Sequence, residues 1–295
     1  MPVIITDYQK PRSLKEALEL LADEHGKTVA IGGGVSIVLS GAPRRMRAVD
    51  LQWAGLDEIS TNGKELRLGA TATFDQIVRS SSAARVGNGI LCYALKTAAS
   101  EPIRRLITVG GNIVQCYYWA TLPPLLLALD AKIHLRTLQH RRTLGADEFF
   151  AEPPPRVLVP GEIVTEVTIP LAPKRKVGFE KFCKTANDYA LIHLVISYAV
   201  QGRKIVEPRV VVGACTNLPV RCHAAEEFLE GQPSNISLEN ALKAGQIVAH
   251  HVALRRDSRA SSAYRRRLMA VLVQRLLSRM SSEGKESQHV EGGLR

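Results

Sequence analysis

The sequence predicts a mixed α+β chain of two domains, and three observations support this prediction. The chain has 295 residues, about twice the roughly 150 residues of an average domain. Apolar residues follow a helical spacing in some segments and a strand-like alternation in others. At residues 172–176, proline and charge replace the apolar pattern, which is typical of a linker. We therefore expect one domain over residues 1–171 and a second over residues 177–280.

The first domain divides into two predicted subdomains, over about residues 1–55 and 56–171. In the first, residues 11–24 favour a helix, because Ser13 can cap its start and Glu16 stands three residues later, as a capping box requires. Short apolar strands are expected at residues 28–31 and 47–51. Together these segments predict a compact βαβ-like unit.

The second subdomain and the C-terminal domain mix strands and helices. In the second subdomain we expect strands at residues 65–69, 132–136 and 163–169, and helices at 74–80, 90–100 and 123–130. In the C-terminal domain we expect strands at 178–184, 192–200 and 209–214, and helices at 226–231, 238–250 and 262–280. Residues 281–295 have few apolar side chains, which predicts a disordered tail.

Composition excludes several classes of protein. The net charge of +11 is compatible with an anionic ligand, a nucleic acid, an anionic membrane or an acidic partner. Only 5% of residues are aromatic and no nucleic-acid motif occurs, so we expect no nucleic-acid partner. No apolar stretch approaches the roughly 18 residues of a spanning helix, and the N-terminus lacks a secretory signal pattern. We therefore expect a cytoplasmic protein without membrane insertion.

Common catalytic and metal motifs are missing from the sequence. The five cysteines form no C-x-x-C pair, and the histidines form no H-E-x-x-H, so we expect neither a disulfide framework nor a metal site. No G-x-G-x-x-G dinucleotide fingerprint and no G-x-S-x-G elbow occur. His193 lies in an apolar predicted strand, which favours a hydrogen-bonded core histidine over a ligand.

Two glycine-containing segments can instead cradle a phosphate. Glycine lets the backbone approach a ligand closely, and successive N–H groups in a turn form an anion site. The first segment consists of Ile31, Gly32, Gly33, Gly34, Val35, Ser36 and Ile37. The second consists of Thr108, Val109, Gly110, Gly111 and Asn112. Each alone is better explained by an ordinary turn, but the pair suits a diphosphate bridging two subdomains.

Short motifs along the chain then point to a family. In chain order they are Ser13-Leu14-Lys15-Glu16-Ala17, the first glycine segment, Val49-Asp50-Leu51, Leu68-Gly69-Ala70, Ile103-Arg104 through Asn112, Pro160-Gly161-Glu162, Phe179-Glu180-Lys181-Phe182, Asp188-Tyr189-Ala190 and Ala260-Ser261-Ser262-Ala263-Tyr264-Arg265-Arg266. In this order and spacing they resemble the FAD-binding medium subunits of molybdenum hydroxylases, the xanthine dehydrogenase and carbon monoxide dehydrogenase family. The stretch ending at Asn112, against the family pattern I-R-N-x-G-T-I-G-G-N, is the most specific match.

The resemblance implies a cofactor, a fold and partners. It implies an FAD-binding fold of the PCMH type with two subdomains, followed by a C-terminal sheet-plus-helix domain. FAD would contact both glycine segments and also Thr121, Ile163 and Lys181. A large subunit would hold the molybdenum cofactor and a small subunit two [2Fe–2S] clusters, in a heterotrimer or a dimer of heterotrimers. The chain would pass electrons between those clusters and an external acceptor, without a catalytic acid or base of its own.

Three departures from the family pattern leave an alternative open. Arg105 stands where the family has asparagine, Ile107 where it has glycine, and Thr121 where it often has aspartate. These changes are also compatible with a flavin-free structural or assembly subunit. The aromatic run Tyr117-Tyr118-Trp119 either contacts the flavin or packs in the core, and we favour the core. The C-terminal excess of positive charge suggests a partner-facing or solvated surface.

Overall fold

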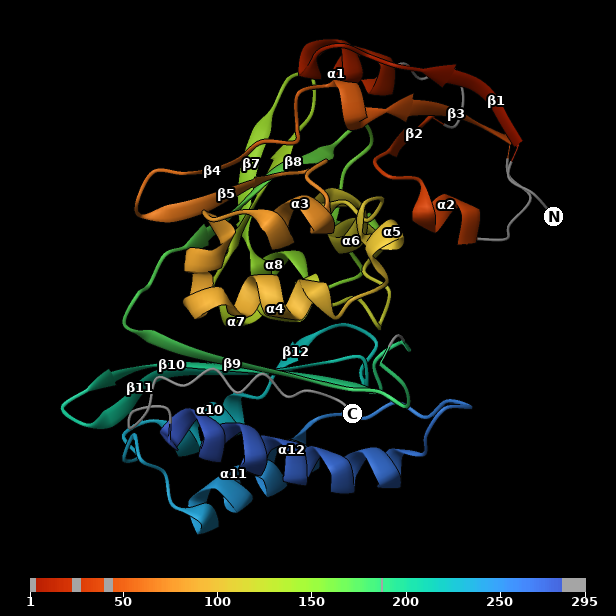
Figure 1. The fold of residues 1–295 in the computed structure, drawn as a ribbon. Coiled ribbons are helices and arrows are strands. Elements are labelled where there is room, and N and C mark those ends of the chain that lie inside the picture. Colours follow the sequence, from red (N-terminus) through yellow and green to blue (C-terminus); the bar gives the residue numbers. More distant parts are fainter. Residues whose placement is uncertain (1–3, 23–27, 40–44, 187, 283–295) are drawn as a thin grey trace.

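Three sheets are stacked along the long axis of the molecule (Figure 1). The computed structural model describes residues 4–22, 28–39, 45–186 and 188–282. The uppermost sheet in Figure 1 is parallel, with strand order β1-β3-β2. The middle sheet is antiparallel, in the order β4-β5-β8-β6-β7, and the lowest is antiparallel, in the order β12-β11-β10-β9.

The element bounds are as follows. The strands are β1 (Ile4–Gln9), β2 (Thr28–Ile31), β3 (Arg45–Asp50), β4 (Ile59–Thr61), β5 (Glu65–Gly69), β6 (Lys132–Arg136), β7 (Arg141–Gly145), β8 (Ile163–Pro170), β9 (Arg175–Phe182), β10 (Ile192–Gln201), β11 (Lys204–Gly213) and β12 (Val220–Arg221). The helices are α1 (Leu14–Ala22), α2 (Val35–Leu39), α3 (Phe74–Arg79), α4 (Ile90–Lys96), α5 (Glu101–Arg104), α6 (Val109–Gln115), α7 (Leu122–Ala128), α8 (Ala146–Phe149), α9 (Pro154–Val157), α10 (His223–Leu229), α11 (Leu238–His251) and α12 (Ser262–Ser282), with 3₁₀ turns η1 (Leu51–Trp53) and η2 (Ala83–Gly89).

Local sequence signals place most of these elements correctly. Ser13 caps α1 as predicted, because its hydroxyl accepts a hydrogen bond from the Glu16 N–H at 3.2 Å. The Glu16 carboxylate accepts from the Arg12 N–H rather than from Ser13. The predicted strands at residues 28–31, 65–69 and 132–136 coincide with β2, β5 and β6.

Other expectations need correction. The sequence does not predict β1 or β7, because neither strand buries a continuous apolar face. The predicted linker at 172–176 is too long, since Arg175 already begins β9 and donates a hydrogen bond to Ser197 on β10. The predicted disordered tail, 281–295, lies outside the described residues from 283 onward, while Ser281 and Ser282 still belong to α12.

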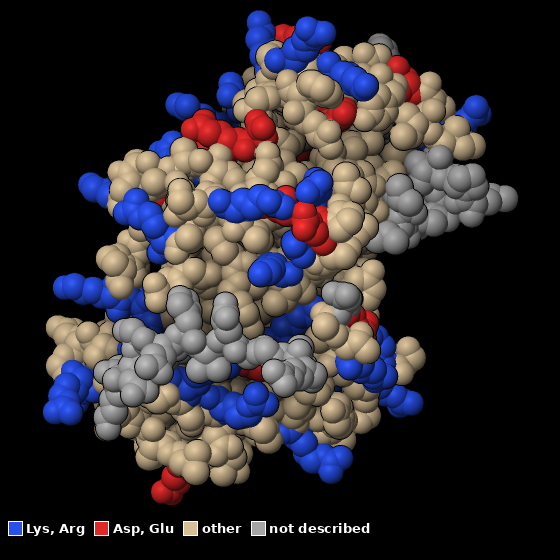
Figure 2. All heavy atoms as spheres, viewed as in Figure 1, with Lys and Arg blue, Asp and Glu red and all other residues tan. Residues whose placement is uncertain are grey.

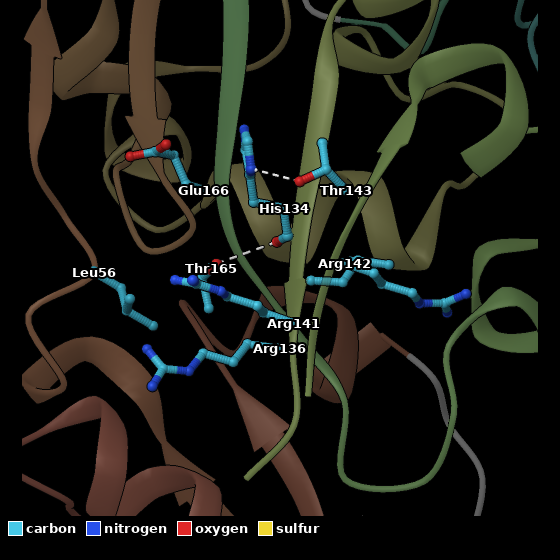
Figure 3. Close-up of a pocket in the computed structure, with 9 residues that line it drawn as sticks. Leu56, His134, Arg136, Arg141, Arg142, Thr143, Thr165 and Glu166 are labelled. Atoms are coloured by element: carbon cyan, nitrogen blue, oxygen red, sulfur yellow. Dashed lines mark hydrogen bonds between the residues drawn. The ribbon is translucent and has the colours of Figure 1, made fainter. Parts of the chain in front are cut away.

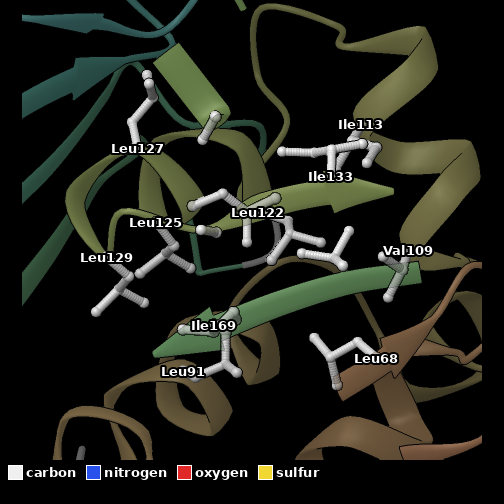
Figure 4. Close-up of a cluster of buried hydrophobic side chains, with 14 of the residues drawn as sticks. Leu68, Leu91, Val109, Ile113, Leu122, Leu125, Leu127, Leu129, Ile133 and Ile169 are labelled. Carbon is white, nitrogen blue, oxygen red and sulfur yellow. The ribbon is translucent and has the colours of Figure 1, made fainter. Parts of the chain in front are cut away.

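Each sheet contributes to its own apolar cluster, and the middle one is the largest. Helices α3, α4, α6 and α7 pack on one face of the middle sheet, where residues such as Leu68, Leu122 and Ile169 are fully buried (Figure 4). The lowest sheet is covered on both faces. Val195 joins the middle cluster, whereas its neighbours Leu194 and Ile196 pack with α11 and α12. The apolar run of β10 is therefore that of a strand buried on both sides.

Within the described ranges, no helix is long and apolar enough to cross a lipid bilayer.

Candidate functional site

The two glycine segments lie directly against each other in the fold. Gly33 follows β2 in the upper sheet, and Leu106 precedes α6 in the middle layer. A Cβ atom built on Gly33 would stand 1.5 Å from the Leu106 carbonyl oxygen, and one on Gly32 would stand 2.5 Å from Thr108 Oγ1. Both positions require glycine because of this close approach. The structure thus brings together the two segments that the sequence placed about 75 residues apart.

The first glycine segment presents open hydrogen-bond donors. Gly34 has φ +74°, a left-handed conformation, and no atom lies within 4 Å of a Cβ built on it. Within the described ranges, the N–H groups of Gly33, Gly34 and Val35 have no protein acceptor. The Gly32 carbonyl faces the other way and accepts from Gln52 Nε2 at 3.0 Å. This loop is therefore a cradle of backbone donors next to empty space, which suits an anion.

The second glycine segment is not a loop between elements. It forms the N-terminal end of helix α6. Thr108 caps this helix, and its hydroxyl accepts from the Gly111 N–H at 3.2 Å. The Gly110 N–H donates to the Ala70 carbonyl at 2.7 Å, and the Asn112 N–H donates to the Thr108 carbonyl at 2.9 Å. These N–H groups are thus engaged within the protein. The sequence could not reveal this difference between the two segments, because the acceptors lie elsewhere in the fold.

Two buried polar atoms near α6 lack partners. Asn112 Oδ1 and Thr71 Oγ1 are inaccessible to solvent and make no hydrogen bond within the described part of the chain. Thr71 adjoins Ala70, whose carbonyl binds Gly110, so Thr71 lies close to the start of α6. An unpaired buried polar atom costs about 1–3 kcal/mol, so such atoms usually have a ligand or water to bind.

The side chains of Arg105 and Ile107, two departures from the family pattern, do not block the space beside Gly34. Arg105 turns away and pairs with Glu101 at 2.7 Å and with Asp75 at 3.7 Å. Ile107 packs against the middle apolar cluster, and its carbonyl accepts from the Phe74 N–H at 2.9 Å. Both bulky side chains are accommodated by neighbours on α3 and α5, so neither fills the space beside Gly34.

Lys181 joins the lowest sheet to the middle layer. Its ammonium group donates to the Thr97 carbonyl, just after α4, at 2.7 Å. Burial lowers the pKa of Lys181 below its usual value, and the positive charge of Arg259 adds to this effect against the raising effects of Cys183 and Asp188. Lys181 is therefore a half-buried, bonded lysine and not a solvated surface residue.

His193 lies beside Lys181, since the two are register partners across β9 and β10. The ring is fully buried, and neither nitrogen makes a hydrogen bond of normal geometry within the described ranges. Burial, and next the Lys181 charge, lower its pKa to about 3, although the nearby Ala120 backbone raises it slightly. The prediction of a core histidine is right about burial and wrong about hydrogen bonding.

Thr121 and Ile163 are both placed inside the protein. Thr121 precedes α7 and is 4% exposed, next to the Ala120 backbone that approaches His193. Ile163 begins β8 and packs with Leu18 and Val49 of the uppermost layer. Its side chain is thus part of the core, and its backbone pairs with Arg136 in the β6–β8 ladder.

The aromatic run forms a half-buried cluster between the middle and lowest layers. The Tyr117 and Trp119 rings stack at 4.7 Å, and Trp119 packs on Tyr189 at 4.7 Å. The Arg255 guanidinium lies over the Tyr118 ring at 3.6 Å. The core packing that we favoured from sequence is therefore only half correct, since these side chains are all partly exposed.

The C-terminal arginines are of two kinds: some are bonded inside the protein, and others, such as Arg256 and Arg267, are exposed, in line with the expectation of a solvated or partner-facing surface. Arg265 is fully buried and binds both carboxylate oxygens of Asp257, at 2.9 and 2.8 Å. Arg259 donates to Asp188 at 2.8 Å and to the Tyr189 and Ala190 carbonyls. Figure 2 shows basic side chains spread over the visible face rather than gathered in one patch. The sequence could not distinguish these buried cations from surface ones.

Comparison with known families identifies the chain. Residues 4–172 match the model of the FAD binding domain in molybdopterin dehydrogenase, and residues 178–280 match that of the CO dehydrogenase flavoprotein C-terminal domain. The chain belongs to the molybdopterin dehydrogenase FAD-binding family. The fold and the family that the sequence predicted are thereby confirmed.

Similar proteins span almost the full length of this flavoprotein. The nicotine 6-hydroxylase medium subunit of Paenarthrobacter nicotinovorans is 30% identical, over 92% of this chain and 95% of its own length. The xanthine dehydrogenase FAD-binding subunit of Escherichia coli O157:H7 is 29% identical, over 92% and 94%. Among solved structures, quinoline 2-oxidoreductase from Pseudomonas putida 86 matches with a TM-score of 0.87 and 25% identity, over 97% of this chain and all of that one.

The residues of this flavoprotein fit the cofactor of its family. The open donors at Gly33, Gly34 and Val35 suit a pyrophosphate, which accepts several hydrogen bonds. A side chain at position 34 would fill the space beside those donors. The unpaired Asn112 Oδ1 adds an acceptor for a hydroxyl or amine of the same ligand. Each of these observations concerns a different chemical group, and each fits a group that FAD carries.

Proposed function

We propose that this medium subunit holds FAD between the first glycine segment and α6, and that it passes electrons between [2Fe–2S] clusters of a small partner and an external acceptor. The single observation that carries the proposal is the contact of Gly33 with Leu106, which sets open backbone donors beside empty space. A bound flavin supplies the ability to exchange one or two electrons at a time, which is why it connects clusters to two-electron acceptors.

In this proposal, different residues of the chain bind or position different parts of the FAD molecule. Gly33, Gly34, Val35 and Ser36 bind the pyrophosphate through their N–H groups, with Ile31, Gly32 and Ile37 shaping the loop. Thr108, Gly110 and Gly111 position the start of α6, and Asn112 binds through its side chain. Lys181 and Thr121 line the end nearest the C-terminal sheet, while Ile163 closes the opposite end.

We further propose that the substrate is oxidised on a large, molybdenum-containing partner and not on this chain. The support for this proposal is that the chain belongs to the molybdopterin dehydrogenase FAD-binding family, whose similar members are named as medium subunits. Purification from cells followed by mass spectrometry tests this point. Recovery of the chain alone under gentle conditions contradicts the partnership.

A pair of glycine variants tests the cofactor site. Gly34→Ala and Gly231→Ala place a Cβ at equal backbone strain, since the two residues have φ +74° and +75° and both face open space. We expect the wild type and Gly231→Ala, purified with added FAD, to retain visible flavin absorbance. Gly34→Ala should bind FAD about tenfold more weakly or worse, which corresponds to about 1.4 kcal/mol.

Two results contradict the proposal in different ways. If the wild type retains no flavin after purification in its presence, the alternative of a flavin-free structural subunit is favoured. If Gly34→Ala and Gly231→Ala retain flavin equally, the cofactor is held elsewhere in the chain. Far-ultraviolet circular dichroism of both variants controls for loss of the fold.

A further inference from the structure

A cleft lies on the middle sheet, at the end of the β6–β7 hairpin. It has a volume of about 530 Å³, within the usual range for a small-molecule site. The lining residues include Leu56, His134, Arg136, Arg141, Thr165 and Glu166 (Figure 3). These side chains come from β6, β7, β8 and the segment that precedes β4. None of them belongs to the glycine segments or to α6.

The feature that requires an explanation is a pair of arginines. Arg136 and Arg141 are direct partners across the antiparallel ladder of β6 and β7, so both side chains emerge on the same face of the sheet. Figure 3 shows both extending in the same direction, toward Leu56. Like charges in directly opposite positions destabilise a strand pair. Both side chains are exposed, so solvent screens much of this repulsion, and an anion bound between them would relieve the remainder.

No acidic residue of the described chain neutralises the pair. Neither Arg136 nor Arg141 forms an ion pair or a side-chain hydrogen bond within the described ranges. The adjacent Arg142 differs, because it points to the other side and binds Glu162 through two bonds of 2.8 and 2.7 Å. In this hairpin, Arg142 thus has a carboxylate partner within the protein, whereas Arg136 and Arg141 have none within the described ranges.

The other polar groups of the cleft do not take the place of a counter-ion. His134 is bonded on both ring nitrogens, to Thr168 and Thr143, each at 3.0 Å. Glu166 stands opposite His134 in the register, and in Figure 3 its carboxylate points away from the two guanidinium groups. The cleft therefore has one half with two free cations and another half that is fixed by hydrogen bonds.

We propose that this cleft binds a phosphorylated small molecule, with Arg136 and Arg141 sharing its phosphate group. Two parallel guanidinium groups match the oxygens of a phosphate, and a doubly charged group offsets two fixed positive charges better than a single carboxylate does. Leu56, which is 8% exposed, adds a small apolar surface beside the two guanidinium groups, whereas the Leu135 side chain is buried in the core. The site is separate from the proposed pyrophosphate cradle and does not depend on it.

Calorimetric titration of the purified full-length chain, both without FAD and saturated with FAD, tests the proposal. The probes are inorganic phosphate and ADP, and the variants are Arg136→Gln and Arg141→Gln, with the exposed Arg85→Gln as control. We expect saturable binding of one equivalent of either probe to the wild type and to Arg85→Gln, and at least a roughly tenfold weaker affinity in each cleft variant. Tighter binding of ADP than of phosphate identifies a nucleotide-like ligand, and equal binding identifies the phosphate alone.

Thermal unfolding in phosphate-free buffer separates a binding role from a structural one. The cleft variants should unfold at the same temperature as the wild type or higher, because the repulsion is relieved, while phosphate should stabilise only the wild type and Arg85→Gln. Three outcomes overturn the proposal. They are no saturable binding, binding that FAD abolishes by competition, and an equal loss of affinity in Arg85→Gln.

Discussion

His193 makes the stability of this protein sensitive to acid in a predictable direction. Its pKa is lowered to about 3 in the folded state by burial and by Lys181, whereas an unfolded histidine titrates near 6.5. Below that pH the unfolded chain binds a proton that the folded chain excludes. The contribution to stability is therefore complete above pH of about 6.5 and is lost as the pH falls toward 3.

The magnitude follows from the two pKa values. Between pH 8 and pH 5, this single proton should lower the free energy of unfolding by about 2 kcal/mol, with a limiting slope of about 1.4 kcal/mol per pH unit. The variant His193→Leu removes the titrating group and also its two unpaired nitrogens. Between pH 8 and pH 5 its free energy of unfolding should therefore fall by about 2 kcal/mol less than that of the wild type.

Urea denaturation followed by circular dichroism at four pH values from 5 to 8 measures this difference. His140→Leu is the matched control, because His140 is exposed on the turn between β6 and β7. We expect its pH profile to follow that of the wild type. If the profiles of His193→Leu and wild type run parallel, the pKa of His193 is the same in the folded and unfolded states and the reasoning is wrong.

Two further predictions concern contacts that hold the C-terminal domain and α6 in place. Arg265→Ala should lower the free energy of unfolding by about 2–3 kcal/mol, because it removes a fully buried guanidinium and its two hydrogen bonds to Asp257, whose carboxylate keeps the N–H groups of Arg259 and Ala260, and a double-mutant cycle with Asp257→Ala should show strong coupling. Thr108→Val should cost about 1 kcal/mol through loss of the cap on the Gly111 N–H, whereas Thr108→Ser should be nearly neutral in urea denaturation.

Much of the local structure and the family could be predicted from the sequence. The cap at Ser13, the alternation of β5 and the long apolar run of β10 each depend on neighbours a few residues away. The edge strand β1 could not be predicted from its own residues, because it is stabilised by backbone pairing with β3 and not by an apolar face.

The candidate site could be predicted only in part, for a similar reason. Both glycine segments were found, since glycine marks positions where backbone approaches backbone. Whether a given N–H is open depends on acceptors far along the chain, such as the Ala70 carbonyl for Gly110. Likewise, the burial of Lys181 depends on its contact with Thr97, 84 residues away in sequence.

The sequence by itself determined the class of the chain, many of its helices and strands and the identity of the cofactor, because these are encoded in motifs of a few residues at fixed spacing. Only the tertiary structure decided which glycine segment keeps free donors, which arginines are buried and which stand unpaired. The physical reason is that a charge or donor is free or satisfied according to what the fold places opposite it. For Arg136 and Arg141 that opposite residue is the other arginine, and for Arg265 it is Asp257.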